Sequence, residues 1–147
     1  MKHLIKAAGV AAATITLTMV TSGSATAAIV EGTRGADNLV GTSSMDRIRG
    51  YEGADRLAGL AGFDREKAHQ GNDTLFGGNG ADMLYPGMGR DHVYGGNGVD
   101  TVIMRFDRQN NIIYCGPGRD AIFFVRRAFD RDDKIISCED VYRVDSV

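Results

Sequence analysis

The sequence predicts an all-β solenoid, a fold in which a short strand recurs coil after coil along one axis. Eight nonapeptides follow one another without a gap from residue 32 to residue 103. The sixth position of every repeat is Asp, and the eighth is apolar in seven of the eight repeats. A fixed short period of this kind is typical of solenoids, in which each repeat packs only against its neighbours.

Each repeat combines a glycine-rich turn with a short apolar segment, as in "GGNGADMLY" (77–85) and "GGNGVDTVI" (95–103). Glycine recurs at positions one, two and four, and we expect these positions to adopt positive φ angles that other residues avoid. The last three residues are predicted to form a strand whose middle residue faces inward. Those middle residues are Leu39, Ile48, Leu57, Glu66, Leu75, Leu84, Val93 and Val102.

The turns predict a metal site built from oxygen atoms alone. A tight glycine turn can direct several carbonyl oxygens at one point, and the Asp adds a carboxylate. Oxygen ligands in an irregular cage favour Ca²⁺ over the smaller Mg²⁺. The best-preserved turns are those of Asp82 and Asp100. The candidate ligands are Asp37, Asp46, Asp55, Asp64, Asp73, Asp82, Asp91 and Asp100, with Gly77, Gly78, Asn79, Gly80, Gly95, Gly96, Asn97 and Gly98 in the two best turns.

The array resembles the haemolysin-type (RTX) calcium-binding nonapeptide repeats of secreted bacterial proteins. The resemblance covers residues 32–103, and a displaced ninth copy, "CGPGRDAIF", occupies 115–123. It implies a right-handed parallel β-roll with two nonapeptides per coil and Ca²⁺ as the cofactor. One edge of the roll would then hold Asp37, Asp55, Asp73 and Asp91, and the other Asp46, Asp64, Asp82 and Asp100.

Stacked carboxylates explain why such a roll would need the metal. Neighbouring coils lie about 4.8 Å apart, and two carboxylates at that distance repel by about 3 kcal/mol at an effective dielectric constant near 20. A divalent cation between successive turns reverses the sign. We therefore expect the array to fold on binding Ca²⁺, in the range of about 10⁻⁴–10⁻³ M that is common for extracellular modules.

The stretch "REKAHQGND" (65–73), which spans the junction of two repeats, breaks the pattern. Glu66 takes an inward position, and Ala68 and His69 replace the first two glycines of the turn. One interpretation is drift in a tolerant solenoid. The alternative is a kink, with Glu66 turned outward or used as an extra ligand.

Residues 1–28 are predicted to be a secretory signal peptide, cut after Ala27 or Ala28. Two lysines precede an apolar run from Ala7 to Val20, and small residues follow. A membrane anchor is the alternative, but the run is short and rich in Ala and Thr. Cleavage would change the net charge from −2 to −4, because Lys2 and Lys6 leave without any acidic residue. A secreted acidic protein of this kind is no candidate for nucleic-acid binding.

The remaining chain divides into the β-roll (29–103) and a C-terminal segment (104–147) with the displaced repeat and a cap. A solenoid end exposes its core and needs such a cover. Cys115 and Cys138, the only cysteines, are predicted to form a disulfide that staples the cap. A redox or metal pair is the alternative, but the sequence lacks CxxC spacing.

Three functions remain open on the sequence. The first is a calcium-binding structural or interaction module without chemistry of its own. The second is a small hydrolase, but no GxSxG or HExxH motif occurs, and His69 and His92 both lie inside repeats. The third is an adhesin that binds an extracellular polymer or surface glycan. It is permitted by two outward-facing sets of residues: Val40, Ala58, Phe76 and Tyr94, and Arg47, Arg49, Arg65, Lys67, Met83, Tyr85 and Ile103.

Overall fold

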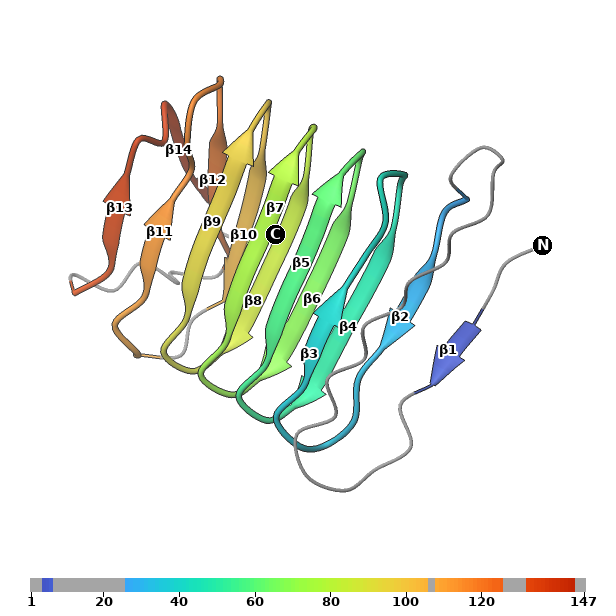
Figure 1. Cartoon of the computed structure of the whole chain (residues 1–147). Coiled ribbons are helices and arrows are strands. Elements are labelled where there is room, and N and C mark those ends of the chain that lie inside the picture. The colour runs from blue at the N-terminus through green and yellow to red at the C-terminus, as the bar shows by residue number, and fades with distance from the viewer. Residues whose placement is uncertain (1–3, 7–25, 106–107, 126–131, 145–147) are drawn as a thin grey trace.

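The computed structural model describes residues 4–6, 26–105, 108–125 and 132–144. They form an all-β parallel solenoid of about 6 turns, as predicted (Figure 1). One sheet has the strand order β1-β2-β4-β6-β8-β10-β12-β14 and the other β13-β11-β9-β7-β5-β3. The strands are β1 (Leu4–Lys6), β2 (Ile29–Glu31), β3 (Asn38–Val40), β4 (Arg47–Glu52), β5 (Arg56–Ala61), β6 (Arg65–Gln70), β7 (Thr74–Asn79), β8 (Met83–Met88), β9 (His92–Asn97), β10 (Thr101–Arg105), β11 (Ile112–Tyr114), β12 (Ala121–Val125), β13 (Lys134–Ile136) and β14 (Asp140–Val144).

Two repeats make one coil, because strands pair with the strand two places along the chain. Thr74 of β7 pairs with His92 of β9, and Arg47 of β4 with Arg65 of β6, each eighteen residues on. Most strands of the array are six residues long rather than three. They continue through positions one to three of the next repeat, where glycine was expected to start the turn. In β5 and β7, for example, Leu60 pairs with Gly78 and Ala61 with Asn79.

Position one is the point at which the predicted turn geometry is wrong. Positive φ angles occur at positions two and four, as at Gly78 (φ 106°) and Gly80 (φ 142°), but not at the glycine of position one. Gly77 instead lies buried inside the roll. Glycine suits this place because a Cβ on Gly77 would lie 2.5 Å from the carbonyl oxygen of Gly95 and 2.6 Å from Oδ2 of Asp82.

The interior contains three residues from each repeat of the central coils: the Asp of position six, the residue of position eight and that of position one. The position-eight column is fully buried, which confirms its predicted inward orientation. Small residues at position one keep the two sheets close together. The buried column consists of Leu39, Ile48, Leu57, Glu66, Leu75, Leu84, Val93 and Val102.

Glu66 points into this core rather than outward, so the outward alternative is wrong. It lies in register between Ile48 and Leu84 and is 0 % exposed. Neither carboxyl oxygen accepts a hydrogen bond of good geometry among the described residues. Burial raises the pKa of Glu66 well above its usual value, and the charges of Asp82 and Asp64 raise it further. The backbone N–H groups of Gly59 and Phe76 lie close enough to lower the pKa in part. The place of Glu66 in an apolar column thus favours the protonated form of the side chain.

We expect Glu66→Leu to stabilise the roll by about 1–3 kcal/mol, because a buried polar group without a hydrogen bond costs about that much. Leucine has a similar size and already fills this position in neighbouring coils. Thermal unfolding in saturating Ca²⁺ measures the change, with Glu66→Gln as the control that keeps a polar group in place. Weaker calcium binding by the Leu variant would instead favour the extra-ligand alternative.

The C-terminal segment adds further coils to both sheets, and β10 crosses the expected boundary between residues 103 and 104. The coil length becomes irregular, since Thr101 pairs with Ala121, twenty residues on, and Ile112 with Lys134, twenty-two residues on. Here larger side chains replace glycine in the interior: Met104, Cys115 and Phe124 are all buried.

The predicted disulfide between Cys115 and Cys138 is present, with the two Cα atoms 5.2 Å apart. Cys115 follows β11 and Cys138 follows β13, which are neighbours in one sheet. The bond therefore staples the last coil of that sheet to the one before it.

The predicted signal peptide lies mostly outside the described residues, apart from β1, which pairs in parallel with β2. Cleavage after Ala27 or Ala28 stays a prediction. In the parts of the chain that the structure describes, no helix has the length and hydropathy needed to cross a bilayer.

Aromatic rings stack along the outer face of the sheet that contains β7, β9 and β11. The ring centres of Phe76 and Tyr94 are 4.9 Å apart, and those of Tyr94 and Tyr114 are 5.2 Å apart. In both pairs the ring planes are nearly parallel. Arg56 covers the free face of Phe76 at 4.2 Å. The rings thus present their edges to solvent, and this ladder supports the sheet rather than offering a flat platform to a sugar.

Candidate calcium site

The aspartates form two columns, one on each edge of the roll, as predicted. The columns are hydrogen-bonded ladders, which the sequence did not reveal. In all eight repeats except that of Asp91, the backbone N–H of the Asp donates to Oδ1 of the Asp one coil further on, as from Asp64 to Asp82 (2.8 Å) and from Asp82 to Asp100 (2.9 Å). All eight predicted carboxylates are buried, with at most 6 % exposure.

The second carboxylate oxygen is buried without a donor in the central coils. A buried, ionised oxygen without a partner is strongly unfavourable, so these atoms require a cation or a proton. The atoms concerned are Oδ2 of Asp55, Asp64, Asp73, Asp82, Asp100 and Asp120.

Each position-one glycine leaves a small cradle beside this oxygen. An atom placed where a Cβ of Gly77 would be lies 2.6 Å from Oδ2 of Asp82 and 2.5 Å from the carbonyl oxygen of Gly95 in the next coil. On the other edge, the corresponding point at Gly32 lies 2.7 Å from Oδ2 of Asp37 and from the carbonyl oxygen of Gly50. Oxygen atoms from two successive coils therefore converge, which fits a hard cation such as Ca²⁺.

Further carbonyl oxygens point from one turn toward the next. The carbonyl oxygen of Gly62 faces the Cα of Gly80, and that of Gly78 faces Gly96. In the described residues, no three His, Cys, Asp or Glu side chains converge on a metal position. The close carbonyl oxygens fit the prediction, from the glycine spacing, that the backbone contributes ligands to the site.

Comparison with known proteins bears directly on this geometry. The family model of the RTX calcium-binding nonapeptide repeat (4 copies) matches residues 31–66 and 68–102. The array consists of RTX calcium-binding repeats. Repeats of this family bind Ca²⁺ as a structural ligand, in agreement with the converging oxygens. A search of the curated proteins found no match to the chain.

The first two turns of the RTX array differ from the rest. Threonine replaces glycine at position two, and Thr33 donates from both its peptide N–H and its hydroxyl to Oδ2 of Asp37. Thr42 does the same for Asp46. These two carboxylates have partners within their own turns, so they depend less on a metal than Asp82 or Asp100.

The RTX ladder extends beyond the predicted ligands. Oδ1 of Asp120, in the displaced repeat, accepts from the N–H of Asp100 at 2.8 Å. Asn111 accepts from Asp91, Asp133 from Asn111, and Glu139 from Asp120. Sequence reasoning missed these roles because the coil length changes after Ile103. The Asp in "CGPGRDAIF" was a signal that could have identified Asp120.

Burial raises the pKa of five carboxylates of the RTX array when no metal is bound: Asp55, Asp64, Asp73, Asp82 and Asp100. The pKa is about 6 for Asp55, Asp73 and Asp100 and about 7 for Asp64. Backbone hydrogen bonds oppose the effect, and neighbouring carboxylates add to it for Asp55, Asp64 and Asp100. At neutral pH the calcium-free roll thus holds carboxylates that are costly to ionise.

This sets the expected pH dependence. A pKa raised in the folded state gives stability that is complete below the unfolded value of 3.8 and is lost as pH rises through about 6 to 7. Acidifying calcium-free protein from pH 8 to pH 5 should therefore increase its β-sheet signal in circular dichroism. In Ca²⁺ the same acidification should weaken metal binding, because protons compete. A calcium-free β signal that falls on acidification would contradict the assignment.

Proposed function

We propose that the chain is a secreted calcium-binding protein whose RTX array folds as Ca²⁺ binds between successive turns, and that it acts as a structural or interaction module. The observation that carries this proposal is the column of buried Oδ2 atoms facing carbonyl oxygens of the next coil. The residues that would hold the ion are the Asp of position six and the backbone of the adjoining turns. Bound Ca²⁺ supplies charge neutralisation within the roll.

Secretion is supported by the predicted signal peptide and by the typical occurrence of RTX repeats in secreted bacterial proteins. The disulfide fits an oxidising compartment. Most described residues belong to the coils or to the turns between them, and the proposal therefore assigns the protein no reaction of its own.

Calcium titration of the chain from residue 29 onward tests the proposal. We expect uptake at millimolar Ca²⁺ and an affinity at least about tenfold weaker for Asp82→Asn, equivalent to about 1.4 kcal/mol. Asp37→Asn is the matched control, since Oδ2 of Asp37 already has donors in its own turn, and its effect should be smaller. No uptake at millimolar Ca²⁺, or equal effects of the two substitutions, would overturn the proposed site.

A further inference from the structure

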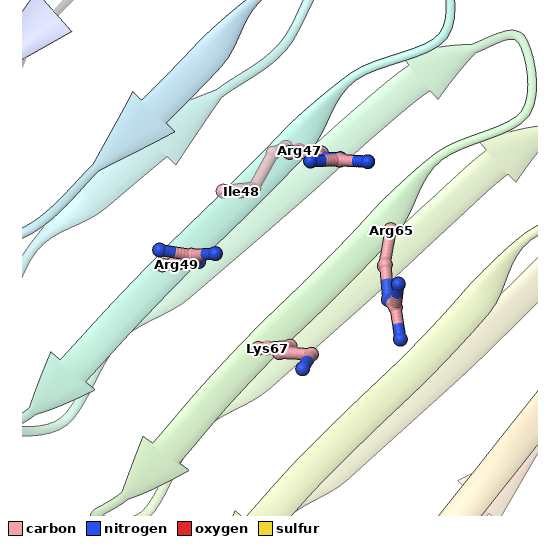
Figure 2. A pocket seen from close by; sticks show the side chains of 5 residues that line it. All are labelled: Arg47, Ile48, Arg49, Arg65 and Lys67. Atoms are coloured by element: carbon pink, nitrogen blue, oxygen red, sulfur yellow. The ribbon is translucent and has the colours of Figure 1, made fainter.

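Four cationic side chains gather on the outer face of the sheet that contains β4 and β6. Arg47 and Arg49 belong to β4, and Arg65 and Lys67 to β6 (Figure 2). The strand register pairs Arg47 with Arg65 and Arg49 with Lys67, so like charges lie directly beside each other. We call these four residues the basic cluster. Such pairing destabilises a sheet unless something compensates the charge.

The protein itself compensates little of this charge. Among the described residues, the one carboxylate that pairs with the cluster is Glu31, whose Oε1 lies 3.3 Å from Arg49. Nε of Arg65 is buried without a hydrogen-bond partner. The pKa of Lys67 is lowered, first by burial and then by the charges of Arg65 and Arg49. This local excess of cations contrasts with the net charge of −2 of the whole chain.

The cluster, together with Ile48, lines a pocket of about 70 Å³. Pockets for drug-sized ligands are several times larger, at about 300–1,000 Å³. This one suits a single small group. Guanidinium and ammonium groups from two strands can donate to several oxygens at once, as a tetrahedral oxyanion requires.

The surrounding aromatic rings argue against a nucleic-acid base as part of the ligand. Base recognition in single strands uses free ring faces. The rings of Tyr51 and His69 stack on each other at 5.7 Å. Tyr85 is approached by Arg65 and Lys67, at 5.2 and 5.0 Å from its ring centre.

We propose that the basic cluster binds a sulfate or phosphate group carried by an anionic polysaccharide. The inference rests on the proposed function, because β4 and β6 lie within the array that folds with Ca²⁺. The cluster lies on the outer face of the sheet, where a polymer chain can place one charged group against the four cations.

Isothermal titration of the calcium-loaded protein with dextran sulfate, and with uncharged dextran, tests the inference. The pocket variant is Arg47→Gln/Lys67→Gln, which spares the hydrogen bond from Arg65 to Tyr85. The matched control is Arg34→Gln/Arg90→Gln, which removes two exposed charges from turns. We expect the parent to bind dextran sulfate and not dextran. The pocket variant should bind at least about tenfold more weakly, and the control within about twofold of the parent.

Three results would overturn the inference: no binding of dextran sulfate by the calcium-folded parent, equal losses in the two variants, or a preference for duplex DNA over dextran sulfate. Calcium titration and circular dichroism of each variant separate this failure from a failure of the proposed function. A parent that takes up no Ca²⁺ refutes the proposed function. If the parent protein folds with Ca²⁺ but does not bind dextran sulfate, only this inference is refuted.

Discussion

Removal of calcium is expected to abolish most of the β-sheet signal of residues 31–102. In the described part of the chain, at least six carboxylates carry a buried Oδ2 without a hydrogen-bond donor, and at least five of these lie between Asp55 and Asp100. A buried polar group left without a partner costs about 1–3 kcal/mol, and more when it is charged. Six such groups cost on the order of 10 kcal/mol, which equals the whole net stability of a typical domain at about 5–15 kcal/mol.

Circular dichroism and small-angle scattering at pH 8, with calcium and with excess EDTA, measure this change. The protein in calcium should be compact and rich in β-sheet, and the chelated protein expanded. Magnesium at the same concentration is the control, because it demands a regular octahedral shell and should restore little of the signal. A β spectrum and a radius of gyration that EDTA leaves unchanged would contradict the calcium-dependent fold.

The second large effect is expected from Gly80→Ala. Gly80 has a φ of 142°, which other residues rarely adopt, and an added Cβ would overlap the carbonyl oxygen of Gly62 in the preceding coil. The turn must then shift, which separates the oxygen atoms that converge between coils. We expect a loss of about 3 kcal/mol or more in the free energy of unfolding, because backbone strain and a steric clash act together.

Gly35→Ala is the matched control, since Gly35 also occupies position four of its repeat. Its φ is not positive, and the nearest atom to an added Cβ is Oγ1 of Thr33 at 3.8 Å. This change should alter stability by less than about 0.5 kcal/mol, as is usual for surface substitutions. Thermal unfolding and the calcium midpoint should be measured for both variants. Similar effects would show that the turns do not depend on their glycines in the way the structure indicates.

The fold was predictable from sequence because the period places the same residue types in the same environment. The inward column follows from the spacing, whereas the division of the aspartates into two columns also needed the two repeats per coil that the resemblance to RTX repeats implies. Positions one to three were harder, because glycine is equally compatible with a turn and with a strand that other atoms approach closely. Gly77 lies in such a closely approached strand, and only the position of Asp82 in space distinguishes it from a turn glycine.

The candidate site was predictable in its residue types and less so in its contacts. A sequence does not show which backbone N–H faces a carboxylate, so the ladder from Asp64 to Asp82 to Asp100 was missed. The different state of Asp37 arises from one Thr at position two, whose donors satisfy Oδ2 locally. Asn111 and Glu139 were missed because the period had ended.

The larger interior side chains near the C-terminus have a consequence for the order of assembly. The last coils contain an ordinary hydrophobic core, formed by Met104, Cys115 and Phe124. The disulfide cross-links this part of the roll. Because each coil contacts only its neighbours, such a core can serve as the template on which the preceding coils fold one after another. Folding would then proceed from the C-terminal coils toward the N-terminal coils, at a rate set by the concentration of Ca²⁺.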